Sequence, residues 1–137
     1  MKMKLVLAGI LFLAITPACQ SEAGREVKVS GSPDPGKVEV YYFHLTRRCA
    51  TCLAVEDVTR ELVESYQGKV VTFTSYNIEE EEGKAKAASF NISGQTLLVV
   101  CGDKQINLTN EAFLYARQTP EKYRDKLRQE IDRLLTP

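Results

Sequence analysis

The sequence predicts an α/β domain in which a mixed sheet of four strands is flanked by helices. Runs rich in β-branched and aromatic residues, typical of buried strands, alternate with segments whose apolar residues recur at helical spacing. The first two strands are separated by a helical segment, so we expect them to pair in parallel through a right-handed crossover. The last two strands are joined by a turn at Gly102-Asp103, which predicts an antiparallel hairpin.

The predicted strands define the sheet. They cover residues 38–43, 70–77, 96–100 and 105–108. The first is β-branched and aromatic throughout, and the third is a short, fully apolar run, so both are expected to be buried on two faces.

The predicted helices fill the gaps between these strands and the end of the chain. The first runs from Cys52 along one apolar face to a glycine breaker at Gly68. The second covers residues 80–90, with acidic residues in its first turn and basic residues later, as the helix dipole favours. We expect Asn110 to cap a helix from residue 111, and Thr119-Pro120 to open the final helix.

Composition bounds the class of protein. The chain has 137 residues and is 44% apolar, enough for one domain with its own core. Its formal net charge is zero, which argues against nucleic acid as a partner. Four cysteines are too few for a disulfide scaffold.

The N-terminal residues 1–18 have the pattern of a signal peptide. A basic start precedes an apolar run that is too short for a permanent membrane anchor. Small residues then precede Cys19, which is similar to the lipobox of bacterial lipoproteins, where cleavage leaves a lipid-modified cysteine. Ordinary cleavage near Ala18 or Ala23 is the alternative. We expect an extracytoplasmic protein, anchored to the membrane through lipidated Cys19 and facing the periplasm or cell surface.

The remaining chain divides into a linker and a domain. Residues 19–37 are rich in Ser, Gly, Pro and mixed charge, a composition typical of flexible linkers. Residues 38–135 carry all the predicted strands and helices and form the predicted domain.

Cys49 and Cys52 form a Cys-x-x-Cys pattern between the first strand and the first helix. Unpaired amide groups at a helix N-terminus favour thiolate over thiol, and Arg47 and Arg48 add positive charge beside Cys49. Cys52 lies one turn further along, on the buried face. The sequence therefore predicts that Cys49 attacks a partner's disulfide and that Cys52 resolves the mixed disulfide.

Two other interpretations of this pattern stay open. A zinc site needs two more ligands, and the sequence leaves only His44, Cys101 and carboxylates to supply them. A purely structural disulfide fits an oxidising compartment, but it has no need of a helix N-terminus flanked by arginines. We therefore favour a redox pair and expect no bound metal or cofactor.

The order of elements, with Cys-x-x-Cys at the start of the first helix, resembles the thioredoxin fold across the whole predicted domain. The resemblance implies that Cys49 is the nucleophile and Cys52 the resolving cysteine. Thioredoxins carry a cis-proline facing the disulfide, just before the hairpin strand, and here Gln95 occupies that place. Tyr41 is expected where the family often has a buried acidic residue.

Four residues are candidates for supporting roles around the pair: His44, Arg47, Arg48 and Gln95. His44 is the single histidine of the sequence and could stabilise the thiolate or carry a proton, the alternative being a loop residue without a role. Cys101 is expected roughly 15 Å from the pair, counting strand residues at about 3.3 Å each, in a half-buried structural position.

The segment of residues 43–52 is also similar to a family of small bacterial proteins named nitrophenyl compound nitroreductase subunit ArsF. This second resemblance implies a redox subunit of a larger enzyme. The sequence carries no flavin-binding signature, so we do not expect nitroreductase activity.

Together these patterns predict a membrane-tethered, extracytoplasmic thiol–disulfide oxidoreductase. Its partners would be protein thiols or disulfides, with a possible dedicated redox partner protein, and its reaction would run through Cys49 and Cys52. The rival hypothesis is a binding or redox-accessory module of the same fold, whose cysteines are structural or bind a soft metal ion.

Overall fold

The computed structural model describes residues 36–136, so the predicted signal peptide, Cys19 and most of the predicted linker lie outside the described residues. The elements are β1 (Val38–His44), α1 (Ala50–Glu64), a short 3₁₀ turn η1 (Gln67–Lys69), β2 (Val71–Asn77), α2 (Glu81–Ser89), β3 (Thr96–Cys101), β4 (Lys104–Asn107), α3 (Thr109–Tyr115) and α4 (Pro120–Leu135). None of the helices in this part of the chain has both the length and the apolar character needed to cross a bilayer.

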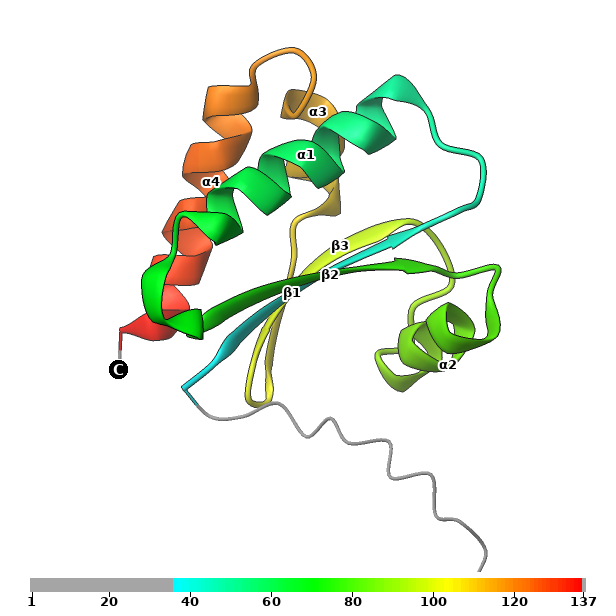
Figure 1. Cartoon of the computed structure of the whole chain (residues 1–137), viewed down its shortest axis with the longest axis horizontal. Helices are drawn as coiled ribbons and strands as arrows, with labels where there is room; N and C mark the ends of the chain where they lie inside the picture. The colour runs from blue at the N-terminus through cyan, green and yellow to red at the C-terminus, as the bar shows by residue number, and fades with distance from the viewer. Residues whose placement is uncertain (1–35, 137) are drawn as a thin grey trace, which may run out of the picture.

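The four strands form one mixed sheet in the order β2-β1-β3-β4. β1 pairs in parallel with β2 and antiparallel with β3, and β3 pairs antiparallel with β4. Figure 1 shows α1, α3 and α4 on one face of the sheet and α2 on the other. This strand order, with these directions, is that of the thioredoxin fold, so the predicted thioredoxin-like sheet flanked by helices is confirmed.

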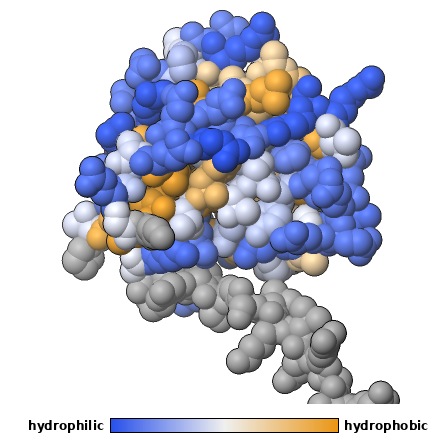
Figure 2. Space-filling view, viewed as in Figure 1, coloured by the Kyte–Doolittle hydropathy of each residue, from blue (hydrophilic) through white to orange (hydrophobic). Residues whose placement is uncertain are grey.

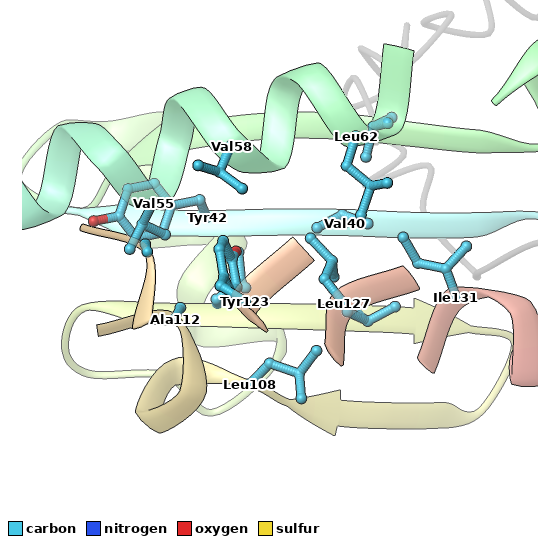
Figure 3. Packing of buried hydrophobic residues seen from close by; sticks show 14 of the residues in the cluster. Val40, Tyr42, Val55, Val58, Leu62, Leu108, Ala112, Tyr123, Leu127 and Ile131 are labelled. Atoms are coloured by element: carbon cyan, nitrogen blue, oxygen red, sulfur yellow. The ribbon is translucent and has the colours of Figure 1, made fainter. Parts of the chain in front are cut away.

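The larger part of the core fills the space between the sheet and α1, α3 and α4 (Figure 3). Leu62 of α1, Leu127 of α4 and Val40 of β1 are almost completely buried there. The Tyr123 hydroxyl is paired inside this core with Thr59 Oγ1 at 2.6 Å. Each fully buried leucine stabilises the fold by about 1.5–3 kcal/mol, so this packing fixes α1 and its first turn against the sheet.

The smaller part of the core lies on the α2 face and is mainly aromatic. Tyr41 and Phe43 point to this face, where they pack with Ala87 and Phe90. Because side chains alternate along a strand, Tyr42 between them points to the α1 face. The expectation that Tyr41 takes the place of the family's buried acidic residue is therefore wrong. A residue in that place has to face α1, which carries Cys52, and Tyr42 is the tyrosine that does so.

The end of α1 and the start of α3 differ from the sequence prediction. α1 ends at Glu64 rather than Gly68, because the Ser65 backbone N–H and hydroxyl turn back to bond the carbonyl of Leu62. α3 begins at Thr109 and is not capped by Asn110. Asn107 Oδ1 instead accepts from the Thr109 backbone N–H at 3.0 Å, so a side chain from the preceding strand fixes the start of the helix.

Candidate redox site

Cys49 is the N-cap of α1. Figure 1 shows the connection that leads from the end of β1 to the start of α1. Its backbone is extended, with φ −87° and ψ 167°, and its Sγ accepts the Cys52 backbone N–H at 3.1 Å. The two cysteines are joined as a disulfide, with their Cα atoms 5.0 Å apart. This is the arrangement that the spacing predicted at the helix start.

The two sulfurs of the pair differ in access. Cys49 is exposed, whereas Cys52 is only 3% exposed and belongs to the buried face of α1. In the reduced protein, Cys49 would keep the amide donor and the helix N-terminus beside it, and both stabilise a thiolate. The geometry therefore lets an outside reactant reach Cys49 and shelters Cys52 behind it.

Gln95 precedes β3 and lies against the buried member of the pair. Its Oε1 is 3.4 Å from Cys52 Sγ, so the reduced Cys52 thiol has an acceptor in place to receive its S–H. The place that the thioredoxin resemblance gives to a proline thus holds an amide side chain in direct contact with the disulfide.

The loop that carries Cys49 is tied to the start of α2. The Thr46 backbone N–H donates to Glu79 Oε2 at 2.7 Å, and Asn77 Nδ2 donates to Thr46 Oγ1 at 2.9 Å. Hydrogen bonding from the Thr46 side chain and from its backbone N–H holds the pKa of the exposed Glu79 carboxyl below its usual range. Part of the acidic run at residues 79–82 therefore has a local structural role in holding the site loop.

His44 closes β1 and its ring lies 5.8 Å from the Tyr42 ring, between centroids. Its Nδ1 is 2.9 Å from the Leu45 carbonyl oxygen. Across residues 36–136, the hydrogen bonds and ion pairs of the structure do not join His44 to either cysteine. Its predicted supporting role stays a prediction.

Arg47 and Arg48 have different surroundings, although they are neighbours in the sequence. Arg47 is exposed and makes no ion pair within the described part of the chain. Arg48 is half-buried, forms an ion pair with Glu56, and lies over the Tyr42 ring, 5.7 Å from its centroid. The expectation that both arginines simply add positive charge beside Cys49 therefore needs correction, because the Arg48 charge is compensated.

Glu56 is a feature of the site that the sequence analysis missed. Its side chain is 13% exposed and accepts hydrogen bonds from Arg48 and, at 2.7 Å, from Arg60. Burial alone would raise the pKa of Glu56, but the two guanidinium groups outweigh it and hold the pKa below its usual range. The signal available in the sequence was its position one helical turn after Cys52 and one turn before Arg60.

Outside the Cys49–Cys52 pair, the candidates for a further site are a metal-binding cluster and the cysteine Cys101. Between residues 36 and 136, no group of three or more His, Cys, Asp or Glu side chains is placed to hold a metal ion. Cys101 is a half-buried free cysteine whose Sγ lies 3.9 Å from the Leu134 carbonyl oxygen.

The surface around these elements is mainly hydrophilic, with a few separate apolar patches, on the face shown in Figure 2. Leu53, which follows Cys52 directly, is 47% exposed. It is an apolar side chain next to the pair that is open to a partner.

The fold and the pair define a class: a thioredoxin-like protein with a Cys-x-x-Cys disulfide at the start of its first helix. No protein-family model matches the sequence. No curated protein matches it either.

Several solved structures are similar to this chain. Thioredoxin O2 from Arabidopsis thaliana in the oxidised state is 25% identical, with a TM-score of 0.45 over 55% of this chain. The chain spans 64% of that thioredoxin's length. The thioredoxin of Fasciola hepatica (18% identity, TM-score 0.48) and the germline-specific thioredoxin Deadhead of Drosophila melanogaster (17%, 0.49) each match over 72% of this chain and 82% of their own. At these TM-scores the fold assignment rests on strand order, strand direction and the position of the pair.

Proposed function

We propose that this protein is a thiol–disulfide oxidoreductase that exchanges disulfides with protein partners through Cys49 and Cys52. One observation carries the proposal: an exposed cysteine at a helix N-cap is bonded to a buried cysteine one turn later. A structural bridge gains nothing from this asymmetry, whereas two-step exchange needs it.

In the reducing direction, the Cys49 thiolate attacks one sulfur of the partner's disulfide. A bond forms between Cys49 and that sulfur, and the partner's other sulfur leaves as a thiolate and takes up a proton. Cys52 then loses its proton and attacks Cys49 Sγ, which releases the partner's second thiol and forms the Cys49–Cys52 disulfide. The partner gains two electrons and two protons: the pair supplies both electrons, Cys52 supplies one proton, and the other replaces the proton that Cys49 released to solvent when it ionised. The oxidising direction is the reverse.

Three features of the site support these steps. The α1 N-terminus and the Cys52 amide stabilise the attacking thiolate of Cys49. Gln95 Oε1 provides an acceptor for the Cys52 thiol before it reacts. Leu53 provides exposed apolar surface beside the pair for a partner's polypeptide.

We also propose that the domain works outside the cytoplasm, tethered by lipidated Cys19. The basic start, the short apolar run and the small residues before Cys19 support this proposal. Expression of the full chain in a bacterial host, followed by mass measurement of its N-terminal peptide, tests it. A diacylated N-terminal cysteine supports the anchor, and an unmodified N-terminus after Ala18 or Ala23 supports simple export.

The proposed activity is tested by the reduction potential of the pair, measured by glutathione redox titration of residues 19–137 after metal removal. A reversible two-electron transition between about −270 and −120 mV supports the proposal. A potential below about −300 mV indicates a structural bridge. An untitratable pair that retains a soft metal favours the accessory-module alternative.

A redox subunit of a larger enzyme is a second candidate, favoured by the similarity of residues 43–52 to ArsF proteins. It predicts that a Cys52→Ser variant, which cannot resolve mixed disulfides, retains one dominant partner through a disulfide to Cys49. A broad mixture of trapped proteins argues for the general oxidoreductase instead.

A further inference from the structure

Arg48 and Glu56 form an ion pair that is mostly withdrawn from water. Only 21% of the Arg48 side chain and 13% of the Glu56 side chain are exposed. Arg48 also lies over the buried Tyr42 ring, and Glu56 also binds Arg60. Three segments therefore meet at this cluster: the strand β1, the residue before the redox pair, and the second turn of α1.

The contribution of this cluster to folding stability is limited. Arg48 Nε is buried without a hydrogen-bond partner among the described residues. Unpaired buried polar atoms are unfavourable, and a buried ion pair often contributes less than apolar side chains of the same volume. Stability alone therefore does not account for charged residues at these positions.

The position of the cluster connects it to the pair. Arg48 directly precedes Cys49, and Glu56 follows Cys52 by one helical turn. Glu56 is two turns from Cys49, about 10 Å along the helix axis. Because the Arg48 guanidinium bonds Glu56, its side chain runs along the helix and its charge is compensated there.

We propose that Glu56 is a positioning residue that sets the redox balance of the Cys49–Cys52 pair by holding Arg48 along α1 and compensating its charge. The inference rests on the proposed function. Without the Glu56 charge, Arg48 is released next to Cys49, where a positive charge stabilises the thiolate. The dithiol form then gains relative to the disulfide, so Glu56 keeps the native pair a weaker oxidant than its arginine-rich sequence implies.

Other charged groups near the pair do not change in the test. Arg47 and His44 belong to the same loop, and Glu79 contacts that loop through Thr46. Arg60 stays beside position 56. Differences in the redox equilibrium between the variants therefore report the effect of the Arg48–Glu56 ion pair.

The test measures the equilibrium of the protein disulfide plus two glutathione thiols with the protein dithiol plus glutathione disulfide. It compares wild type, Glu56→Gln, Arg48→Met and the double variant. We expect Glu56→Gln to shift the equilibrium constant about three- to tenfold toward the dithiol, or about 14 to 30 mV. We expect Arg48→Met to shift it in the opposite direction, and the double variant to return close to wild type.

A matched control removes the same charge elsewhere on α1. Glu61 is 65% exposed and pairs with Arg124 at 2.8 Å, so Glu61→Gln should leave the equilibrium unchanged. The fraction of Cys49 present as thiolate at a given pH, followed by ultraviolet absorbance, gives a second readout. The thiolate fraction should rise in Glu56→Gln and fall in Arg48→Met. If the ion pair were merely structural, the two variants would not shift either readout in opposite directions.

Equal or same-direction shifts in the two folded single variants would overturn the inference and leave the proposed function standing. If Glu56→Gln does not fold, Arg48→Met decides alone: a shift toward the disulfide supports the inference, and no shift or the reverse overturns it. A wild-type protein with no reversible transition would overturn the proposed function itself, and that result is known before any variant is compared.

Discussion

The two ends of the sheet each have a cysteine nearby, and only one end has the geometry of a redox site. At the end where β1 finishes, Cys49 caps α1 and is bonded to Cys52. β3 runs antiparallel to β1, so Cys101, its last residue, lies at the opposite end. There a half-buried thiol packs against the core, and its Sγ lies 3.9 Å from the Leu134 carbonyl oxygen.

The difference shows that placement in the fold, and not residue type, distinguishes the two cysteines. Cys49 has a helix N-terminus, an amide donor, a second sulfur within bonding reach and access to solvent. Among residues 36–136, Cys101 has none of the first three, because it ends a strand instead of starting a helix. The same residue type is therefore expected to do redox chemistry at one end and packing at the other.

The largest expected effect comes from replacing one cysteine at each end. Cys49→Ser should reduce catalysed insulin reduction by dithiothreitol to the uncatalysed rate, because a hydroxyl does not attack a disulfide under these conditions. Cys101→Ser should keep the wild-type rate. Loss of activity in Cys101→Ser, or retention in Cys49→Ser, would contradict the comparison.

The next largest effect is expected in the core, where a substitution should lower stability without changing the reduction potential of the Cys49–Cys52 pair. Leu127→Ala should destabilise the protein by about 2–5 kcal/mol in urea unfolding, since Leu127 of α4 is fully buried in the core between the helices and the sheet. Its reduction potential should stay that of wild type. Leu114→Ala, at a side chain 62% exposed, is the control and should change stability by less than about 0.5 kcal/mol. A shifted potential in folded Leu127→Ala would show that the core tunes the pair.

A smaller effect is expected at the pair's end of the sheet, where α2 approaches β2 closely. A Cβ at Gly83 would lie 1.8 Å from the Asn77 carbonyl oxygen. The backbone at Asn77, whose side chain hydrogen-bonds Thr46, must therefore shift. Gly83→Ala should cost about 1–3 kcal/mol in urea unfolding. Gly94→Ala, which meets no atom within 4 Å, is the control. Equal stability of the two variants would mean that α2 moves freely away from β2.

The smallest expected effect is in the dependence of stability on pH. Because the pKa of Glu56 in the folded protein is below its usual 4.5, its ionised form stabilises the fold above about pH 4.5. That contribution is lost as the pH falls through the lower, folded-state value. Wild type should therefore lose about 0.2–1 kcal/mol more than Glu56→Gln between neutral and acid pH. Unfolding curves that fall equally in both proteins would argue against the Arg48–Glu56 pair.

Local patterns in the sequence predicted much of the fold. The apolar strands, the helical spacing after Cys52 and the Gly102-Asp103 turn all appear where the sequence indicates, because each depends on neighbouring residues. The end of α1 and the start of α3 were misplaced because hydrogen bonds of the Ser65 and Asn107 side chains fix them, and residue spacing does not show which polar side chain makes such a bond.

The sequence by itself determined the two cysteines, their spacing, and their position between a strand and a helix. These follow from residue order and from backbone amides that any helix start provides. Only the tertiary structure decided which charges matter. It brought Gln95 onto Cys52 across 43 positions of sequence and turned Arg48 onto Tyr42 and Glu56. Such contacts depend on which side chains the packed sheet and helix bring within a few ångströms, and sequence spacing does not encode that distance.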